Sequence, residues 1–482
     1  MPFENERANK SSHRDLVENP DVSSFLGDCA VITVPTQEEA QEFASQFVEP
    51  PSYESLALPD AVVAIDGSLY ESQIYKNALP STRVGYVKIV TLLIKTAEFA
   101  GIRDQATGLV DPFLLARLRD SSDSLAVPLP GSNVRYQSRD TVREGFRAAL
   151  EDSFLSEKTW IDKNPTRSLR STLFAVATNR SSETSLYTGD PNRLRLHKCP
   201  SCSTDGTSTQ PIEVRNDGKV QRCPHCREEI FATDCLRIWE TVGEGAPIGE
   251  ALGRTMSAIE HLLPLHYARH LAETSLDAIA GLAFFVDGPL AVFGNAAWIH
   301  SGILRLYHEL NEKLSKANRE PMIMIGLQKT GAVREHVDLI DRFIKKNRIF
   351  PISDEYRYKY ISPRTISANK QADEIGFGLE TYYGQDFIFK TPSSKTFVIS
   401  VPYPFRAKRE AKGLTGKPFK EAKTSIMAYA TLARALRIVQ YFESDLYTNA
   451  SIPIALAHQH TAISLVPGGK VLDLLTHRGL RK

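Results

Sequence analysis

Two aspartates are the residues of this chain whose surroundings most favour catalytic chemistry. Asp66 follows five apolar residues in AVVAIDGSLYES, Ala61 to Ser72, and Asp287 follows a similar run in GLAFFVDGPL, Gly281 to Leu290. Each apolar run predicts a buried strand of parallel type that ends at the aspartate and gives way to a glycine turn. Two carboxylates at one end of a sheet repel each other, so the pair indicates a metal site with oxygen ligands. The alternative is that each Asp-Gly is simply a turn, which the match between the two segments disfavours.

Two Cys-x-x-Cys pairs, separated by twenty residues, form a second group with chemical meaning. Their spacing is typical of a zinc ribbon, with the thiolates of Cys199, Cys202, Cys223 and Cys226 on one tetrahedral ion. Four thiolates leave no open position on the metal, so this zinc is expected to be structural. His197 and His225 are then expected to lie outside the ligand set. Cys29 and Cys235 are the remaining cysteines, and a reducing compartment favours a metal over disulfides.

Composition limits the class of protein. The chain has 482 residues, is 42% hydrophobic and is long enough for two or three domains or one large one with insertions. Its longest apolar run, Ala278 to Val286, is too short to cross a bilayer, and the start MPFENERANKSSHRD lacks the apolar stretch of a signal peptide. A soluble, cytoplasmic protein is expected. The formal net charge of +1 neither indicates nor excludes nucleic acid.

The elements that would position the two aspartates follow from periodicity and turn signals. The stretch Val84 to Phe99 is rich in β-formers and is expected to pair antiparallel with the first strand. Strand, helix, strand and helix in succession after Gly281 predict the parallel half of a mixed α/β sheet. Further helices are predicted at Thr36–Phe47, Arg139–Leu155, Thr233–Ser275 with a break at Gly243–Pro247, Ala296–Ala317, Ala332–Lys346 and Thr424–Tyr441, and further strands at Ser168–Thr178, Pro321–Thr330 and, as a hairpin, Phe387–Pro402.

Four short motifs, in their order along the chain, resemble the NurA nuclease family. They are AVVAIDGSLYES, FFVDGPL, MIGLQKT and PIALAHQHTAIS. The resemblance runs from about Pro59 to Leu475 and is interrupted by the zinc ribbon. It implies an RNase H-like mixed sheet flanked by helices, into which the zinc ribbon of four cysteines predicted above is inserted as a segment outside the family core. We expect an N-terminal helical segment at 1–58, a nuclease domain in two parts at 59–190 and 233–482, and the ribbon at 191–232.

The resemblance also implies roles for particular residues. The family's aspartates fall on Asp66 and Asp287, and its middle glutamate falls best on Glu260 in RTMSAIEHL, with Glu273 as the alternative. Its late Ala-His motif falls on His458. The lysine after the third apolar strand is Lys329. The family often has a tyrosine about eight residues before the histidine, where this chain has Ala450 and, out of register, Tyr447.

Hydrolysis of a phosphodiester needs an activated water, charge neutralisation and a stabilised leaving oxygen, which two cations about 4 Å apart can supply. Asp66 would bridge them, while Glu260 and Asp287 would each complete one side, in an oxygen-rich site suited to Mn²⁺ or Mg²⁺ rather than zinc. His458 is a candidate metal ligand, proton donor or phosphate contact, and Lys329 a candidate phosphate contact. Their ordinary interpretations are a helix histidine and a solvated lysine, and Glu260 would ordinarily be a surface carboxylate.

The implied function is a metal-dependent DNA nuclease, a 5′–3′ exonuclease, an endonuclease or both, that works as a homodimer with a HerA-like hexameric ATPase. DNA end processing and anti-phage defence both remain open. Arg406 to Lys423 has seven basic and two acidic residues on a segment expected to be irregular, which suits a phosphate backbone or simply solvent. No ATP site is recognisable, so a motor must come from a partner. The alternatives are a non-catalytic DNA-binding scaffold that recruits the ATPase through its ribbon, and RNA cleavage.

Overall fold

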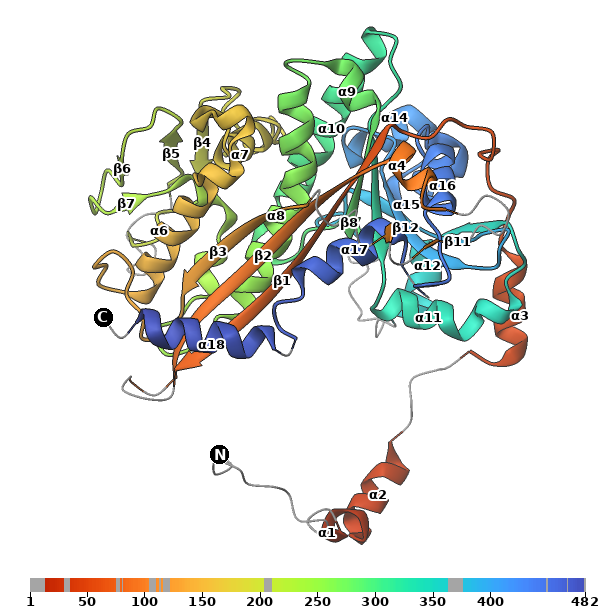
Figure 1. The fold of residues 1–482 in the computed structure, drawn as a ribbon, viewed down its shortest axis with the longest axis horizontal. Helices are drawn as coiled ribbons and strands as arrows, with labels where there is room; N and C mark the ends of the chain where they lie inside the picture. Colours follow the sequence, from red (N-terminus) through yellow and green to blue (C-terminus); the bar gives the residue numbers. More distant parts are fainter. Residues whose placement is uncertain are drawn as a thin grey trace.

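An eight-stranded mixed sheet forms the centre of the computed structural model (Figure 1). Its strands follow the order β10-β11-β12-β9-β8-β1-β2-β3, in which β8 is parallel to β1 and β9 and the other neighbours are antiparallel. The alternation of strands and helices along the chain thus produces a mixed α/β fold. The strands are β1 Ala61–Ile74, β2 Thr82–Lys95, β3 Ser122–Pro130, β8 Leu282–Asp287, β9 Ile323–Gln328, β10 Arg348–Pro351, β11 Gly384–Lys390 and β12 Thr396–Pro402.

The structure describes residues 14–29, 35–74, 79, 81–103, 110–111, 114–115, 122–202, 210–362, 376–447, 450–465 and 467–480. Part of the stretch between the two cysteine pairs lies outside these residues. Among the helices that are described, none combines the length and the apolar character needed to cross a membrane.

Helices cover both faces of the sheet. Successive side chains of a strand point to opposite faces, and the central strands carry apolar side chains on both, so each face needs a cover. On one face, Val63 and Ile65 of β1 share a core with α6 Val142–Phe154, α7 Leu169–Thr178, α8 Gly249–Leu271 and α10 Ile299–Lys316. On the opposite face, Val62 and Ala64 share a core with α4 Thr96–Ala100, α16 Leu432–Tyr441 and α17 Ile452–Thr461. A third core joins α3 Gln37–Ser45 and α11 Ala332–Ile340 to β10–β12.

The remaining described α-helices are α1 Arg14–Val17, α2 Pro20–Asp28, α9 Leu276–Ala280, α12 Asp354–Tyr356, α14 Ala411–Thr415, α15 Phe419–Ala422 and α18 Gly468–Gly479. Two small hairpins carry the four cysteines: β4 Arg193–Leu196 with β5 Ile212–Arg215, and β6 Gln221–Arg222 with β7 Glu229–Ile230.

Most predicted elements are present, and local chemistry explains their ends. Thr36 caps α3 and Thr141 caps α6, each in a capping box with a glutamate three residues later. The strand predicted at Ser168–Thr178 is wrong, because Leu169–Thr178 is helix α7. Its buried residues Leu169, Leu173, Val176 and Ala177 recur at helical spacing and fill the core beside α6 and α8. Packing in the core therefore decides whether this short apolar stretch forms a strand or a helix.

The first aspartate strand also differs from the prediction. β1 does not end in a turn at Asp66 but continues to Ile74, paired throughout with β2. Only its parallel pairing with β8 stops, at Ile65 opposite Val286. Asp287, in contrast, does end β8, and Gly288 follows with φ of +88°, a conformation that favours glycine.

Candidate active site

Three charged residues follow the buried residues on one face of three adjacent strands. Asp66, Asp287 and Lys329 come two residues after Ala64, Phe285 and Leu327, all of which face the core around α17. Since β1, β8 and β9 are neighbours in parallel, these side chains meet at the edge where the parallel pairing ends. The sequence thus brings two acids and a base to one place on the sheet.

Helix α17 supplies the contacts that hold Asp66. The Asp66 side chain is 2% exposed, and its Oδ2 accepts a hydrogen bond from Thr461 Oγ1 at 2.9 Å. The same oxygen lies 2.9 Å from His458 Nδ1. His458 and Thr461 are three residues apart and therefore lie on one face of the helix. The His458 side chain is 56% exposed, so it contacts both the buried Asp66 carboxylate and the solvent.

Lys329 pairs with both aspartates. Its Nζ lies 2.9 Å from Asp287 Oδ2 and 3.9 Å from Asp66 Oδ1. Burial, and next the neighbouring Asp66 carboxylate, raise the pKa of Asp287 to about 7, against the opposing effect of Lys329. One lysine therefore does not fully offset the charge that the acids bring to this edge.

Glu260 reaches the same edge from the opposite face of β1. It lies on α8 and is 6% exposed, and it accepts a hydrogen bond from the backbone N–H of Gly67. A Cβ on Gly67 would lie 2.7 Å from Glu260 Oε1, so the missing side chain makes room for this carboxylate. Burial, then Asp66, then Asp287 raise the pKa of Glu260 well above its ordinary value. The third acid therefore interacts electrostatically with the two aspartates.

The alternative glutamate lies elsewhere. Glu273 follows the end of α8, and its carboxylate pairs with Arg167 at 2.8 Å, with 46% of its side chain exposed. Of the two glutamates, the fold brings only Glu260 to the aspartates.

Three of these residues form a group that could hold a metal ion. One ligand atom each from Asp66, Asp287 and His458 lies within 4.8 Å of the others. Glu260 is not in this group, although the sequence predicted that Asp66, Glu260 and Asp287 together would hold two cations. The third member of the group is instead His458, whose role the sequence left open.

Two residues that contribute to the site were missing from the sequence interpretation. Thr461 carries a signal that could have been used, since it follows His458 at helical spacing. Gly67 carried a misleading one, because an Asp-Gly pair suggests a turn whereas here the glycine lies within a strand. His460 is not in the group of possible metal ligands, and its carbonyl accepts a hydrogen bond from Lys88 Nζ of β2 at 2.5 Å.

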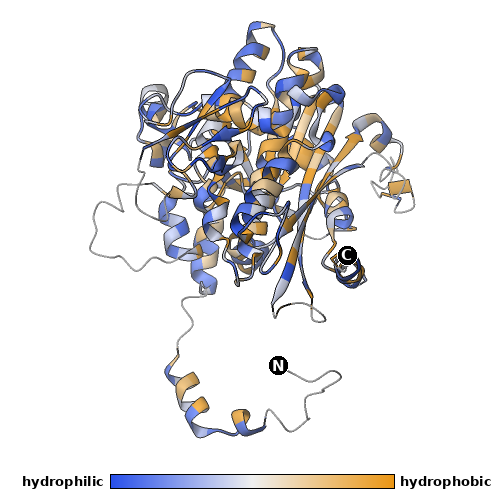
Figure 2. Ribbon diagram, turned by 90° about the vertical axis from the view of Figure 1, so that its left-hand side faces the viewer, coloured by the Kyte–Doolittle hydropathy of each residue, from blue (hydrophilic) through white to orange (hydrophobic). Residues whose placement is uncertain are grey.

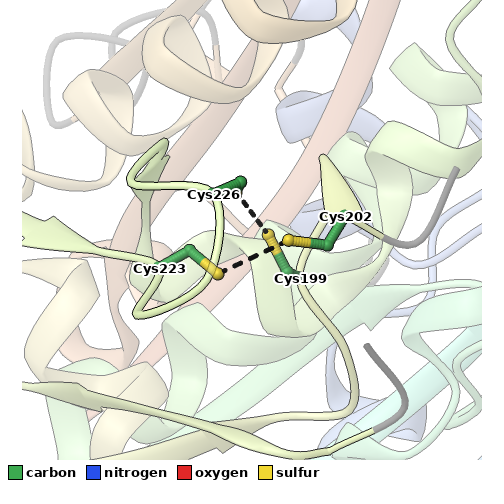
Figure 3. Close-up of side chains that lie close together, drawn as sticks. All are labelled: Cys199, Cys202, Cys223 and Cys226. Carbon is green, nitrogen blue, oxygen red and sulfur yellow. Dashed lines mark hydrogen bonds between the residues drawn. The ribbon is translucent and has the colours of Figure 1, made fainter. Parts of the chain in front are cut away.

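The four cysteines form a second group that could hold a metal ion (Figure 3). Sγ atoms of Cys199 and Cys226 are 3.7 Å apart, as are those of Cys202 and Cys223, and all four lie within 4.8 Å of one another. A disulfide would need about 2.05 Å. Cys29 and Cys235 are not part of the group.

The basic segment Arg406 to Lys423 is less irregular than expected, since it contains α14 and α15. Two of its lysines are used inside the protein. Lys408 Nζ donates to the carbonyls of Gly378 and Leu379, and Lys423 pairs with Asp354. Arg406 and Arg409 remain exposed at the rim of a cavity of about 860 Å³. Fewer cations are therefore available to a phosphate backbone than the sequence suggests.

Comparisons with known proteins add little to this geometry. No protein-family model matches the chain, and no curated protein matches it. A solved structure described as "Crystal structure of NurA" matches with 11% sequence identity, covering 98% of this chain and 98% of that chain, at a TM-score of 0.30. A TM-score of 0.30 does not establish a shared fold, so the geometry of the site has to support any function.

Proposed function

We propose that this chain is a metal-dependent nuclease that hydrolyses phosphodiester bonds of DNA at the edge carrying Asp66 and Asp287. One observation carries the proposal: ligand atoms of Asp66, Asp287 and His458 converge within 4.8 Å, beside the buried carboxylate of Glu260. Placing two buried acids and a partly buried third, Asp287, beside one lysine is costly unless a cation or protons compensate their charge. Bound divalent cations would compensate the negative charge of these acids, which explains why the acids lie together.

The donor atoms suit Mn²⁺ or Mg²⁺. Carboxylate oxygens are preferred by these hard cations, and an imidazole is compatible with manganese. Asp66 and Asp287 would hold the metal, with His458 as a further ligand and Glu260 completing the side nearest Gly67. When bound, such cations neutralise phosphate charge and lower the pKa of a coordinated water.

The remaining residues have roles that follow from their contacts. Thr461 keeps Asp66 in one orientation by donating to its Oδ2. Lys329 lies beside Asp287 and supplies positive charge toward a phosphate that approaches the edge. The His458 side chain is 56% exposed and its Nδ1 lies 2.9 Å from Asp66 Oδ2, so its other ring nitrogen, Nε2, could exchange a proton with a reacting group.

The motif resemblance to NurA supports DNA as the substrate and a HerA-like hexameric ATPase as the partner. It also supports an RNase H-like classification of the sheet, the two-part nuclease domain at 59–190 and 233–482, and a homodimer. Cleavage from a 5′ end, internal cleavage, and a purpose in DNA end processing or anti-phage defence belong to the same proposal. RNA is the competing substrate.

Zinc is our proposal for the four cysteines, in a structural role. A tetrahedral ion with zinc–sulfur bonds of about 2.3 Å has sulfur–sulfur edges of about 3.8 Å, close to the two 3.7 Å separations. The two metal sites then differ in chemistry, one with thiolates and one with carboxylates.

The test uses the purified chain with linear DNA, circular DNA and RNA, each in Mn²⁺, Mg²⁺ or chelator. We expect metal-dependent cleavage of DNA that falls at least about 100-fold in Asp66→Asn and in Asp287→Asn, because each substitution removes a negatively charged ligand. Asp277→Asn is the matched control, since Asp277 is exposed and pairs with Arg319 away from the site. Its activity should equal that of the unmodified chain.

The outcomes separate the alternatives. DNA that remains intact in every metal, with and without the ATPase, would favour the DNA-binding scaffold. Cleavage that survives both asparagine substitutions would place the active site elsewhere. Preferential cleavage of RNA would keep the site and change the substrate.

A further inference from the structure

Helix α18 is attached to the body by its polar side. Tyr70 and Ser72 of β1 donate hydrogen bonds to the Asp473 carboxylate, at 2.9 and 2.7 Å. The hydroxyls of Tyr86 and Thr476 lie 2.6 Å apart, and Thr476 is buried. An amphipathic helix on a protein surface normally buries its apolar side, so this attachment is the reverse of the usual one.

The apolar side of α18 faces away from the body. Val471, Leu474 and Leu475 are 58%, 61% and 58% exposed, and their spacing places them on one face of the helix. Lys470 and Arg478 flank this stripe and are also exposed. Together they form an apolar surface bordered by positive charge, which we call the α18 face.

The two N-terminal helices carry a surface of matching character. Phe25 and Leu26 of α2 are 66% and 62% exposed, and Val22 lies one turn earlier on the same side. No residue of α1 or α2 is buried. Figures 1 and 2 show these helices apart from the rest of the chain, and Figure 2 shows their hydrophobic segments in orange. The acids around this stripe, Asp15, Glu18, Asp21 and Asp28, outnumber the one base, Arg14.

We propose that α2 of one copy of this chain packs on the α18 face of a second copy. Both stripes have apolar residues at i, i+3 and i+4, the pattern by which two helices bury a shared seam. The acids beside the α2 stripe would lie near Lys470 and Arg478, so charge favours the same pairing. A single contact would account for both exposed apolar surfaces.

The reach of the chain favours a second copy over the same one. α3 lies beside β10, because Val48 bridges to Ile349, whereas α18 contacts β1, five strand spacings or about 24 Å across the sheet. The contacts at Tyr70 and Ser72 also lie about 20 Å along β1 from its last pairing with β8. Residues 29–36 span at most about 28 Å when fully extended. Figure 1 shows α3 and α18 on opposite sides of the molecule.

Exchange in both directions would give a symmetric dimer. Each copy would donate α2 and accept one, so the helix pair occurs twice about a twofold axis. One short helix pair is small beside the about 1,600 Å² of a standard interface, and the repetition doubles it. The inference concerns association alone and does not depend on the proposed nuclease activity.

The first test measures mass in solution by light scattering after size exclusion. We expect a dimer at micromolar concentration, and a monomer for Leu474→Asp/Leu475→Asp and for Phe25→Asp/Leu26→Asp. These side chains are exposed, so the variants should keep the circular dichroism of the unmodified chain. Met427→Asp is the control, because Met427 is 86% exposed on another part of the surface and should leave the dimer intact.

The second test identifies the pairing. Phe25→Cys in a tagged chain and Leu474→Cys in an untagged chain, both with Cys29→Ser, are mixed and treated with a short bismaleimide. A cross-linked species containing one chain of each kind is expected. A monomer at all micromolar concentrations would overturn the proposal, as would a dimer unaffected by the aspartate substitutions. A third variant carries Phe25→Cys and Leu474→Cys in the same chain, also with Cys29→Ser. Cross-linking that occurs only within this chain, and not between the two single variants, would show that α2 folds back on its own α18 and would overturn the proposal.

Discussion

Gly67 makes room for an acid to reach the candidate active site from the far side of the sheet. Its nearest potential Cβ contacts are Met256 Cγ at 2.6 Å, Glu260 Oε1 at 2.7 Å and Ile89 Cδ1 at 2.8 Å. Its φ is not positive, so space rather than backbone conformation requires glycine here. The two residues of the Asp-Gly pair therefore serve opposite faces of the sheet. Asp66 contacts α17 on one face, and Gly67 leaves space for Glu260 of α8 on the other.

Gly67→Ala tests this role of the glycine. The added methyl group must displace Glu260, Met256 or Ile89, which costs about 1–3 kcal/mol of stability and moves the carboxylate away from the backbone N–H of Gly67. We expect the Mn²⁺ concentration that half-saturates DNA cleavage to rise about tenfold or more. Cleavage rates across a Mn²⁺ titration, together with urea unfolding, measure the two effects.

Gly253→Ala is the control for that substitution. Gly253 lies in the same helix as Glu260, and a Cβ there meets Leu69 at an ordinary 3.8 Å. Alanine in a helix is favoured over glycine by about 1 kcal/mol, so this variant should be at least as stable and keep the original metal dependence. If Gly67→Ala shows the same behaviour as Gly253→Ala, the space at Gly67 does not govern the site.

At the scale of elements, the cysteine segment is continuous with the main core. Cys199, Cys202 and Cys223 belong to the same buried cluster as residues of α6, α7 and α8. Arg147 of α6 also donates a hydrogen bond to the carbonyl of Glu229 in β7, at 2.7 Å. A metal held by the cysteines would therefore stabilise the helices behind the central sheet as well as its own hairpins. Deleting the segment would expose that core, so single substitutions are the better probe.

Cys223→Ser tests the metal at the cysteine cluster. Removing one thiolate should abolish the one zinc per chain that we expect from atomic absorption, and the melting temperature should fall by several degrees, because metal binding contributes folding free energy. Cys29→Ser, at an exposed cysteine outside the cluster, should change neither quantity. Asp66→Asn should also retain zinc, which would separate the two metal sites. Zinc that is absent from the unmodified chain would contradict the assignment.

At the scale of the whole molecule, buried histidines make stability depend on pH. Burial lowers the pKa of His261, His266 and His336 to about 4, and that of His270 and His300 to about 3. For His266, burial is the largest cause of the lowered pKa and the nearby Arg269 adds to it, against the opposing effect of the Thr159 carbonyl, which lies 2.8 Å from Nε2. Its Nδ1 lies 2.7 Å from Thr172 Oγ1. Both ring nitrogens are engaged in a neutral tautomer, so a second proton is not accommodated.

The sign of the effect follows from the lowered pKa values. Above pH 6.5 these rings are neutral in both states, and as pH falls from 6.5 toward 4 the unfolded chain binds protons that the folded chain does not. Each such histidine should therefore lower the free energy of unfolding over this window, with a slope that approaches about 1.4 kcal/mol per pH unit well below pH 6.5. Asp287, whose pKa is raised to about 7, contributes in the opposite direction. Urea unfolding between pH 7 and 5 measures the slope.

His266→Gln and His336→Gln isolate individual contributions. Each should reduce that slope by about one proton, and the double variant by about two, because the two rings lie in different cores. His336 lies on α11, 2.6 Å from the Tyr356 hydroxyl, whereas His266 lies on α8. An unchanged slope in both single variants would show that these rings titrate alike in the folded and unfolded chain.

Local patterns were enough to predict the mixed α/β class, the pairing of the first two strands and the meeting of Asp66 with Asp287. These features depend on period-two burial and on apolar runs that end in a charge, both of which are visible along the chain. The cysteine cluster is equally local, because each Cys-x-x-Cys turn presents two thiols on its own. Lys329 follows the same rule as the aspartates, one strand further along.

Only the tertiary structure decided which distant side chains complete these groups. Glu260 rather than Glu273 joins the aspartates because α8 crosses behind Gly67, and Ser168–Thr178 is helical because its apolar residues fill a core that other segments build. The inverted attachment of α18 likewise depends on Tyr70, Ser72 and Tyr86, far away in the chain. Periodicity shows which residues share a face, but the partner of that face is determined by how the elements pack.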